Sequence, residues 1–479
     1  MQFDLSSSDN NEKSLRAMLS DSTDFKASEL QAGERRYHLF YLDTMIELAV
    51  VQEHIIRPLL QRPGVSIREA VSILDYSETE HLTAASHALL EGKIVLQIAG
   101  HTKLYVLGAA QHKERAVNVP VNEKVLRGSK HALIEDMNTN LNMLRKLVAT
   151  PDLVVKFYQL GRRSNTKVAV LYLRSVINEE VVKEIEGRLG NIAIDYVESP
   201  GFVQEQIQES WFSLFPQLLV TERPDRVRSY LMDGKAAILT DGSPECVIAP
   251  VSFWTFFQSP DDYQIDWLFG SAFRFLRIVC FIVAFTLPGA YVALVTFDPR
   301  IIPFEIALTL QSSMKYIAMP PVMEAICMMV TLEILREATI RLASPVGQTI
   351  GVVGGIVIGT VVVQSNLISN MMVIIVAFTA IASFVIPVYE MRTSARLLAY
   401  PTIILCALFG YIGLELAFLL ILTHLARLNT MGIPYFYSGI LGGSIRDTIF
   451  RGPLRSLKER PKESLAQDKV RIRSPKGLK

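Results

Sequence analysis

The chain has 479 residues, half of them apolar and a fifth charged, and its formal net charge is +1. This length allows two or three domains beside a membrane part. Because the charge balance is near zero and the basic excess is confined to the C-terminal end, we expect no nucleic-acid partner.

Charged residues are distributed unevenly along the chain. They are frequent up to Trp267, rare beyond it, and frequent again from Arg427, where twelve Arg and Lys residues stand against four Asp and Glu. Apolar stretches of about 20 residues are long enough to span a bilayer as helices. We therefore expect a soluble N-terminal α/β region of two subdomains, an all-α polytopic membrane domain over residues 267–426, and a short basic tail over 427–479.

The first part of the soluble region is polar and then helical in pattern. Residues 1–34 are rich in Ser, Asn and Glu, which predicts a flexible arm without the features of a signal peptide. From Tyr37 to Leu60 apolar residues recur at a spacing near 3.6, and KIVLQIAG followed by TKLYVLGA indicates a short hairpin. We predict a small, mainly helical subdomain over residues 35–120.

Strand and helix patterns alternate over residues 121–260, which predicts an α/β subdomain. VAVLYL, IAIDYV and FPQLLVTE have the composition of strands, and Asp241-Gly242 marks the turn of a later hairpin. The chain has no glycine-rich phosphate loop and no histidine pair at metal-ligand spacing. We therefore predict no catalytic residue, metal or cofactor. The SPDDY run at 259–263 is expected to cap a helix or to dock at the membrane surface.

The membrane domain is expected to contain five long apolar segments and one doubtful one. The doubtful segment, Ile301–Met319, is interrupted by Pro303, Glu305 and Lys315, which favours an interfacial or re-entrant position. The five others are Ile278–Phe297, Val322–Ile340, two spans between Arg341 and Glu390 joined by QSNLISN, and Ala399–Leu422. The four cysteines show no disulfide framework, which favours a cytoplasmic soluble region. The basic tail favours the same side, so we expect an even number of crossings.

Small residues recur at every fourth position in one uncharged span, at Gly347, Gly351, Gly355 and Gly359. Such a face lets another helix approach closely, either within one subunit or between subunits. At 100° per residue, the opposite face holds the residues that we predict to line a pore, namely Thr349, Val353, Ile356, Thr360 and Gln364. Helical hydroxyl groups can also donate to their own backbone, so polarity alone does not establish a pore.

Four carboxylates lie within the apolar segments, at Glu324, Glu333, Glu337 and Glu415. A carboxylate in a membrane is costly unless it is paired, so each is a functional candidate. The second and third have Arg336 and Arg341 at helical spacing, which favours structural ion pairs. The first and last have no partner within a turn, which favours a role on an ion pathway or between helices.

Six blocks and a DG-x-P hairpin, in order from about Glu123 to Ser438, resemble signatures of the GerA family, the A subunits of bacterial spore germinant receptors. The blocks are EKVLRGSKHALIEDMNTNLNMLR, TERPDRV, FFQSPDDY, EILREATIRLASPVGQTIG, AIASFVIP and GIPYFYS. The resemblance implies a subunit in the spore inner membrane that acts with B and C subunits and responds to nutrients by releasing monovalent cations. It also implies a homo-oligomer of A subunits that forms a channel in the lipid bilayer, with the glycine-rich helix as the pore wall.

One position departs from the family pattern. Where an acidic residue is expected after the glycine-rich helix, the chain has VQSNLIS with Gln364. A ring of amides attracts cations less strongly than a ring of carboxylates, which argues for weaker charge selectivity. Two other functional classes stay open: a secondary transporter that uses the intramembrane carboxylates, and a non-conducting assembly or signalling scaffold of the SpoVAF-like type.

Overall fold

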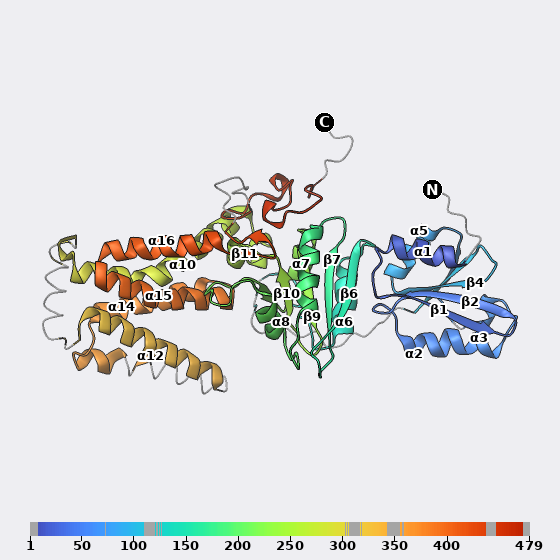
Figure 1. The fold of residues 1–479 in the computed structure, drawn as a ribbon, viewed down its shortest axis with the longest axis horizontal. Coiled ribbons are helices and arrows are strands. Elements are labelled where there is room, and N and C mark those ends of the chain that lie inside the picture. The colour runs from blue at the N-terminus through green and yellow to red at the C-terminus, as the bar shows by residue number, and fades with distance from the viewer. Residues whose placement is uncertain are drawn as a thin grey trace.

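The computed structural model describes residues 8–71, 73–109, 120, 123, 125, 127–301, 303, 305, 317, 319–342, 355–356, 359–436 and 447–472. Figure 1 shows an elongated molecule with two sheet-bearing subdomains towards one end and a helical part at the other. The predicted order of an N-terminal α/β region followed by an all-α part is confirmed.

The first subdomain is an antiparallel sheet with helices on both faces. In spatial order its strands are β1 (Phe25–Ala32), β2 (Arg35–Leu42), β4 (Lys93–Ile98), β5 (Leu104–Gly108) and β3 (Tyr76–Thr79). One face is covered by α1 (Ser8–Met18) and α5 (Leu82–Leu90). The other is covered by α2 (Leu48–Val51), a π-helical turn (Gln52–Ile56), α3 (Arg57–Gln61) and α4 (Ile67–Ala70). Each face has its own buried apolar cluster.

Two predictions about this region are wrong. Residues 8–34, predicted as part of a flexible arm, contain α1 and the edge strand β1. The segment 35–120, predicted to be mainly helical, contributes the other four strands. The pattern misled because β2 buries Tyr37, Leu39, Phe40 and Leu42, so its RRYHLFYL sequence lacks the clean alternation of a half-exposed strand.

The second subdomain is another antiparallel five-stranded sheet. In spatial order its strands are β6 (Leu153–Leu160), β7 (Thr166–Leu173), β9 (Ala236–Thr240), β10 (Cys246–Ala249) and β8 (Leu219–Thr221). Its helices are α6 (Met137–Leu147) and α9 (Pro224–Met232) on one face, and α7 (Glu179–Gly190) and α8 (Pro200–Ile207) on the other. The hairpin with its turn at Asp241-Gly242 is confirmed, and Gly242 has the left-handed φ of +86° that such a turn needs. Residues 192–197, predicted as a strand, form none.

A buried ion pair fixes the first subdomain to the second. The Asp24 carboxylate, just before β1, accepts hydrogen bonds from Nε and Nη2 of Arg145 in α6 at 2.8 and 2.7 Å, and from the hydroxyls of Ser22 and Thr44. Burial raises the pKa of Asp24, but Arg145 and the hydroxyl donors outweigh burial and hold this pKa below its usual range. The two subdomains therefore share one charged, hydrogen-bonded core.

The C-terminal part is helical. Its helices are α10 (Trp267–Thr296), α12 (Pro321–Arg341), α14 (Asn370–Val385), α15 (Tyr389–Phe409) and α16 (Tyr411–Arg427). Among the helices that the structure describes, only α10 is long and apolar enough by length and composition to cross a membrane. The predicted single segment Ala399–Leu422 is wrong, because Gly410 adopts φ +60° and reverses the chain between α15 and α16. The segment Ile301–Met319 lies mostly outside the described residues.

The helical part begins and ends beside the second subdomain (Figure 1). At the end of α16, Nε2 of His424 lies 2.9 Å from the hydroxyl of Ser213 in the soluble region. The chain then forms β11 (Asn429–Thr430), β12 (Ile433–Pro434) and the segment 447–472. Nε of Arg460 in this segment donates to the carbonyl of Met232 at 2.8 Å. The C-terminal segment thus packs against the second subdomain, and the number of crossings stays a prediction.

Candidate functional site

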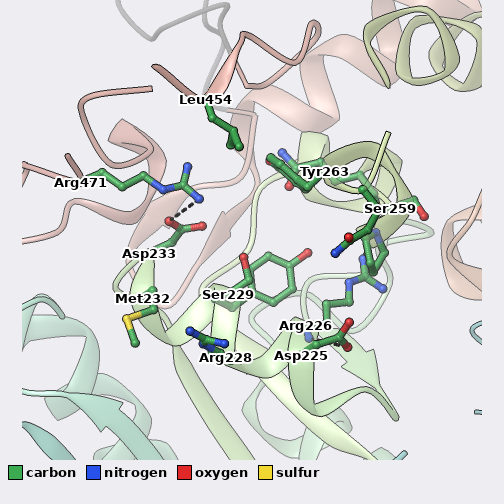
Figure 2. Close-up of a pocket in the computed structure, with 14 residues that line it drawn as sticks. Asp225, Arg226, Arg228, Ser229, Met232, Asp233, Ser259, Tyr263, Leu454 and Arg471 are labelled. Carbon is green, nitrogen blue, oxygen red and sulfur yellow. Dashed lines mark hydrogen bonds and ion pairs between the residues drawn. The ribbon is translucent and has the colours of Figure 1, made fainter. Parts of the chain in front are cut away.

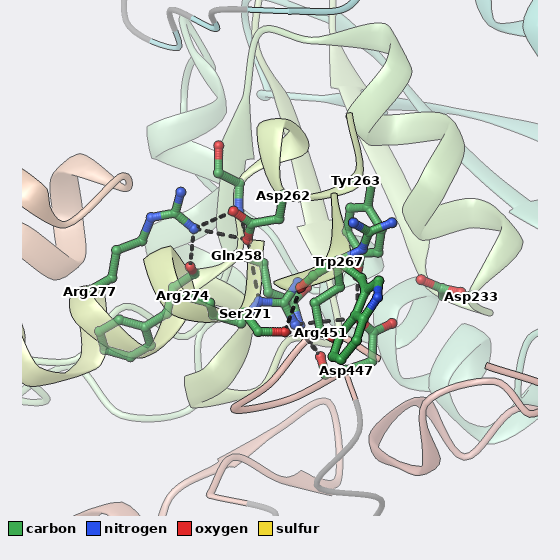
Figure 3. A network of polar contacts seen from close by, with 12 residues as sticks. Asp233, Gln258, Asp262, Tyr263, Trp267, Ser271, Arg274, Arg277, Asp447 and Arg451 are labelled. Carbon is green, nitrogen blue, oxygen red and sulfur yellow. Dashed lines mark hydrogen bonds and ion pairs between the residues drawn. The ribbon is translucent and has the colours of Figure 1, made fainter. Parts of the chain in front are cut away.

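A buried polar network joins the second subdomain to α10. A short 3-10 turn at Pro260–Tyr263 begins with a capping box between Ser259 and Asp262. This turn holds the fully buried Asp262 carboxylate against the first turns of α10 (Figure 3). Gly270 permits the close approach, since a Cβ at this position would lie 2.7 Å from the Asp262 carbonyl oxygen. The local sequence therefore positions one carboxylate at the start of the helical part.

Two arginines of α10 share this carboxylate. Nη1 of Arg277 donates to the two oxygens of Asp262 at 2.7 and 2.9 Å, and Nε of Arg274 donates at 3.3 Å. Arg274 also donates through Nη1 to the backbone carbonyl of Asp447 at 2.7 Å. Removing one partner of a buried ion pair leaves the other charge uncompensated, which costs free energy. Asp262 and the two arginines therefore stabilise the junction only while all three are present. The predicted capping role of the SPDDY run is present in the capping box, and its buried carboxylate binds α10; the alternative of docking at the membrane surface stays a prediction.

The segment after α16 completes the network. The Asp447 carboxylate accepts from the Tyr263 hydroxyl at 2.6 Å and from Nη1 of Arg471 at 3.3 Å. Nη1 of Arg451 donates to the Ile265 carbonyl at 2.7 Å, just before α10 begins. The 260–265 segment and residues 447–471, which are distant from each other in the sequence, therefore meet at the first helix of the C-terminal part.

A polar cavity of about 410 Å³ opens beside the network, between α9, the 260–263 turn and residues 454–471 (Figure 2). Asp233 and Arg471 face each other in it, with 3.7 Å between Oδ1 and Nη2. Asp233 is only 8% exposed. Burial raises the pKa of Asp233 to about 6, although Arg471 and Lys235 act in the opposite direction. This carboxyl group therefore changes its charge close to neutral pH.

Two of the four predicted membrane carboxylates have no ion pair within one turn, as the sequence indicated. Glu324 is buried, and its Oε2 accepts from the backbone N–H of Ser369, the N-cap of α14, at 2.9 Å. A carboxylate is favourable at a helix N-terminus, so Glu324 links α12 to α14. Glu415 is exposed on α16 and forms no hydrogen bond or ion pair with the residues that the structure describes.

The other two carboxylates are held by arginines. Glu333 accepts from Nη1 of Arg336 at 3.1 Å, and Glu337 accepts from Nε of Arg341 at 2.8 Å, so the predicted local ion pairs are present. Glu333 also accepts from Nη2 of Arg396 in α15 at 3.2 Å. This interhelical contact joins α12 to α15 and was not indicated by spacing along the sequence.

The predicted pore helix is described only in part. Thr349, Val353, Gly347 and Gly351 lie outside the described residues. Ile356 is 61% exposed, Thr360 and Gln364 are also exposed, and the Thr360 hydroxyl donates to the Ile356 carbonyl at 2.7 Å. A Cβ added at Gly355 or Gly359 would have no described atom of another segment within 4 Å. Among the described residues, these positions are exposed or have open space beside them, and the pore-lining and packing roles of the two faces stay predictions.

Most charged residues of the junction were missed by sequence reasoning. Arg274 and Arg277 lie three positions apart at the start of an apolar helix, directly after two carboxylates, and this was the available signal. Asp447 lies 173 positions after Arg274, and no pattern in the sequence connects them. The structure is therefore needed to show that the C-terminal segment belongs to the site.

Comparisons with known proteins identify the family. The model described as Bacillus/Clostridium GerA spore germination protein matches residues 13–463. Spore germination protein A1 of Bacillus subtilis (strain 168) is 35% identical over 443 residues, which cover 91% of each chain. Spore germination protein B1 of the same organism is 34% identical over 99% of this chain and 100% of its own length. Spore germination protein GerLA of Bacillus cereus is 36% identical over 90% of this chain and 85% of its own length.

A solved structure also matches the N-terminal half. It is the crystal structure of the N-terminal domain of the A subunit of the Bacillus megaterium spore germinant receptor GerK3, with a TM-score of 0.39 and 24% identity over 52% of this chain and 96% of that chain. The family match itself extends over nearly the whole length, through the soluble region, the helices and the C-terminal segment. The chain belongs to the GerA family of spore germination proteins.

Proposed function

We propose that this chain is the A subunit of a nutrient germinant receptor, acting with B and C subunits in the spore inner membrane. The relatives of similar length are spore germination proteins, which supports a role in germination. In this proposal the helical part crosses the membrane several times, and the N-terminal region and the C-terminal segment lie together in the cytoplasm.

Several copies of the chain form a channel for monovalent cations in this proposal. The observation that carries it is the open helix around residues 359–364, with no described neighbour beside Gly355 and Gly359 and with Thr360 and Gln364 exposed. An apolar helix with two uncovered faces in a membrane domain needs other helices around it. A glycine face allows copies to pack closely around an axis, and their threonine and glutamine faces then line the path.

The surroundings of three of the four predicted membrane carboxylates favour a channel over a proton-coupled transporter. Glu324 accepts a hydrogen bond from a helix N-terminus, and Glu333 and Glu337 accept hydrogen bonds from arginines. A proton-coupled transporter needs carboxylates that bind and release protons during its cycle. Carboxylates with these structural partners suit a scaffold around a pore.

The junction supplies a route from nutrient binding to the pore. Asp262 ties the soluble region to α10, and Asp447 ties the C-terminal segment to the same helix. A nutrient signal that shifts the soluble region or a partner subunit therefore displaces α10, against which α14 and α15 pack. Gating in this proposal is a shift between two arrangements of this packed bundle.

The test is cation release from spores that carry Thr360→Lys at matched receptor levels. A lysine in every copy repels cations, so nutrient should release little or no cation. Thr423→Lys on α16 is the matched control, because Thr423 is also exposed and also donates to the carbonyl four residues before it, at 2.7 Å. Normal release from Thr360→Lys spores would show that this helix is not the pore wall.

A further inference from the structure

A second cavity, of about 840 Å³, lies where α12, α14 and α15 meet the edge strand β8 of the second subdomain. Its helical side is lined by Arg336, Arg392 and Arg396. The side of the second subdomain is lined by the carboxylates of Glu123, Glu222 and Glu245, and Glu390 in the first turn of α15 adds a fourth. Neither the predicted pore face nor the junction network uses these three arginines, so their positive charge needs another explanation.

The arginine side of the cavity is short of negative charge. Among the residues that the structure describes, the carboxylate paired with this group is Glu333, which bonds Arg336 and Arg396. Arg392 donates instead to the Ile386 carbonyl at 2.9 Å. Glu333 is therefore the carboxylate that the described hydrogen bonds place on these guanidinium groups, and an anion between Arg392 and Arg396 would add a further acceptor.

One of these arginines is buried with an unused donor. Arg396 is 6% exposed, and its Nη1 has no hydrogen-bond partner among the described residues. A buried donor without a partner costs free energy, and a guanidinium edge matches the paired oxygens of a phosphate or carboxylate. The other two arginines contact one aromatic ring. The Cζ atoms of Arg336 and Arg392 lie 5.1 and 5.8 Å from the centroid of the Phe384 ring.

The rest of the lining suits an amphiphile. Leu335, Ile340 and Phe384 also line the cavity, and the last two are 61% and 55% exposed. The cavity lies where the helical part adjoins the soluble region, which is the level of lipid head groups if the helices cross a bilayer. Basic pockets between membrane helices at this level bind lipid head groups. The carboxylates on the soluble side disfavour a doubly charged free phosphate and attract an ammonium group.

We infer that this cavity binds the phosphodiester of a phospholipid, with the phosphate on Arg336, Arg392 and Arg396 and the acyl chains along Ile340 and Phe384. The inference rests on the proposal that the helical part lies in a bilayer. The lipid thereby joins α12 and α15 to the second subdomain and supplies an acceptor for the unused Arg396 donor.

The test is native mass spectrometry of the full-length protein in detergent with added phosphatidylethanolamine. Wild-type protein should retain one lipid more tightly than Arg336→Gln or Arg392→Gln, by about tenfold or more, because each variant removes a charged hydrogen-bond donor. The two variants lie on different helices, so that if one variant misfolds, the other still tests the inference. Arg341→Gln is the control, because Arg341 is on α12 and exposed but does not line the cavity.

Equal lipid retention by the two cavity variants and the control would overturn the inference. Inorganic phosphate is added in a parallel arm, and displacement of the lipid by phosphate at equal concentration would overturn the lipid assignment in favour of a free anion site. Extraction of the wild-type protein without detergent would instead contradict the membrane proposal itself, so the two failures are distinguishable.

Discussion

Asp262 compensates two guanidinium groups at once, those of the buried Arg274 and the partly buried Arg277. Asp262→Asn keeps the shape of this side chain but leaves the two arginines without their shared charge. Breaking a buried charge pair costs about 3–5 kcal/mol, so we expect a lower melting temperature and less extractable protein. Asp266→Asn is the control, because Asp266 is an exposed N-cap and asparagine caps as well as aspartate. Equal melting temperatures of the two variants would mean that the network does not hold α10.

Asp233 makes the stability of the soluble region depend on pH. Its pKa is about 6 in the folded protein and near its ordinary value of 3.8 when unfolded, so the folded state holds the proton more tightly. The stability that the neutral carboxyl group contributes is complete below about pH 4 and is lost as pH rises through about 6. The difference between these two pKa values corresponds to about 3 kcal/mol. Asp233→Asn should therefore raise the melting temperature at pH 7.5 and hardly change it at pH 4. Parallel profiles of both proteins across this range would contradict the assignment.

The α15–α16 hairpin depends on glycine at two positions. Gly410 provides the left-handed turn, and a Cβ at Gly413 would lie 2.0 Å from the Leu405 carbonyl oxygen. Gly413→Ala must push the two helices apart, and we expect it to destabilise the chain by about 1–3 kcal/mol. The melting temperature of the detergent-extracted protein measures this loss.

Gly355 gives the opposite expectation, because a Cβ added there would meet no described atom within 4 Å. Gly355→Leu should leave the melting temperature of the chain unchanged but reduce its assembly into oligomers, since a large side chain keeps neighbouring helices apart. Size-exclusion chromatography in detergent checks the assembly. A Gly355→Leu protein that assembles like the wild type would contradict the packing role of this face.

Elements that are determined by neighbouring residues in the sequence were predictable. Elements that depend on packing against distant parts of the chain were not. The hairpin of β4 and β5 and the break between residues 364 and 370 follow from turn residues and were found. Strand β2 was misread as part of a helix because both its faces are buried. The turn at Gly410 was missed because hydropathy is equally high on both sides of it, and only the backbone conformation separates the two helices.

The whole molecule connects its parts through charges that no local pattern reveals. Asp24 and Arg145 are 121 positions apart, and Arg274 and Asp447 are 173 positions apart. The carboxylates of the SPDDY run were predicted to cap a helix or to dock at the membrane surface, but their arginine partners and the C-terminal segment were not predicted. Burial of each pair depends on the packing of whole subdomains, so the coupling of soluble region, α10 and C-terminal segment is visible only in three dimensions.

Conduction by the assembled chain separates the channel from a transporter and from a scaffold. The measurement is monovalent cation flux into liposomes that contain the purified full-length chain, alone and with the B and C subunits, with and without nutrient. We expect a cation flux that does not depend on cotransport with a second ion. The flux should require nutrient when the partner subunits are present. Thr360→Lys should abolish it, and Thr423→Lys should leave it intact. Absence of flux from an assembled complex under every condition, or flux that Thr360→Lys leaves unchanged, would contradict the account.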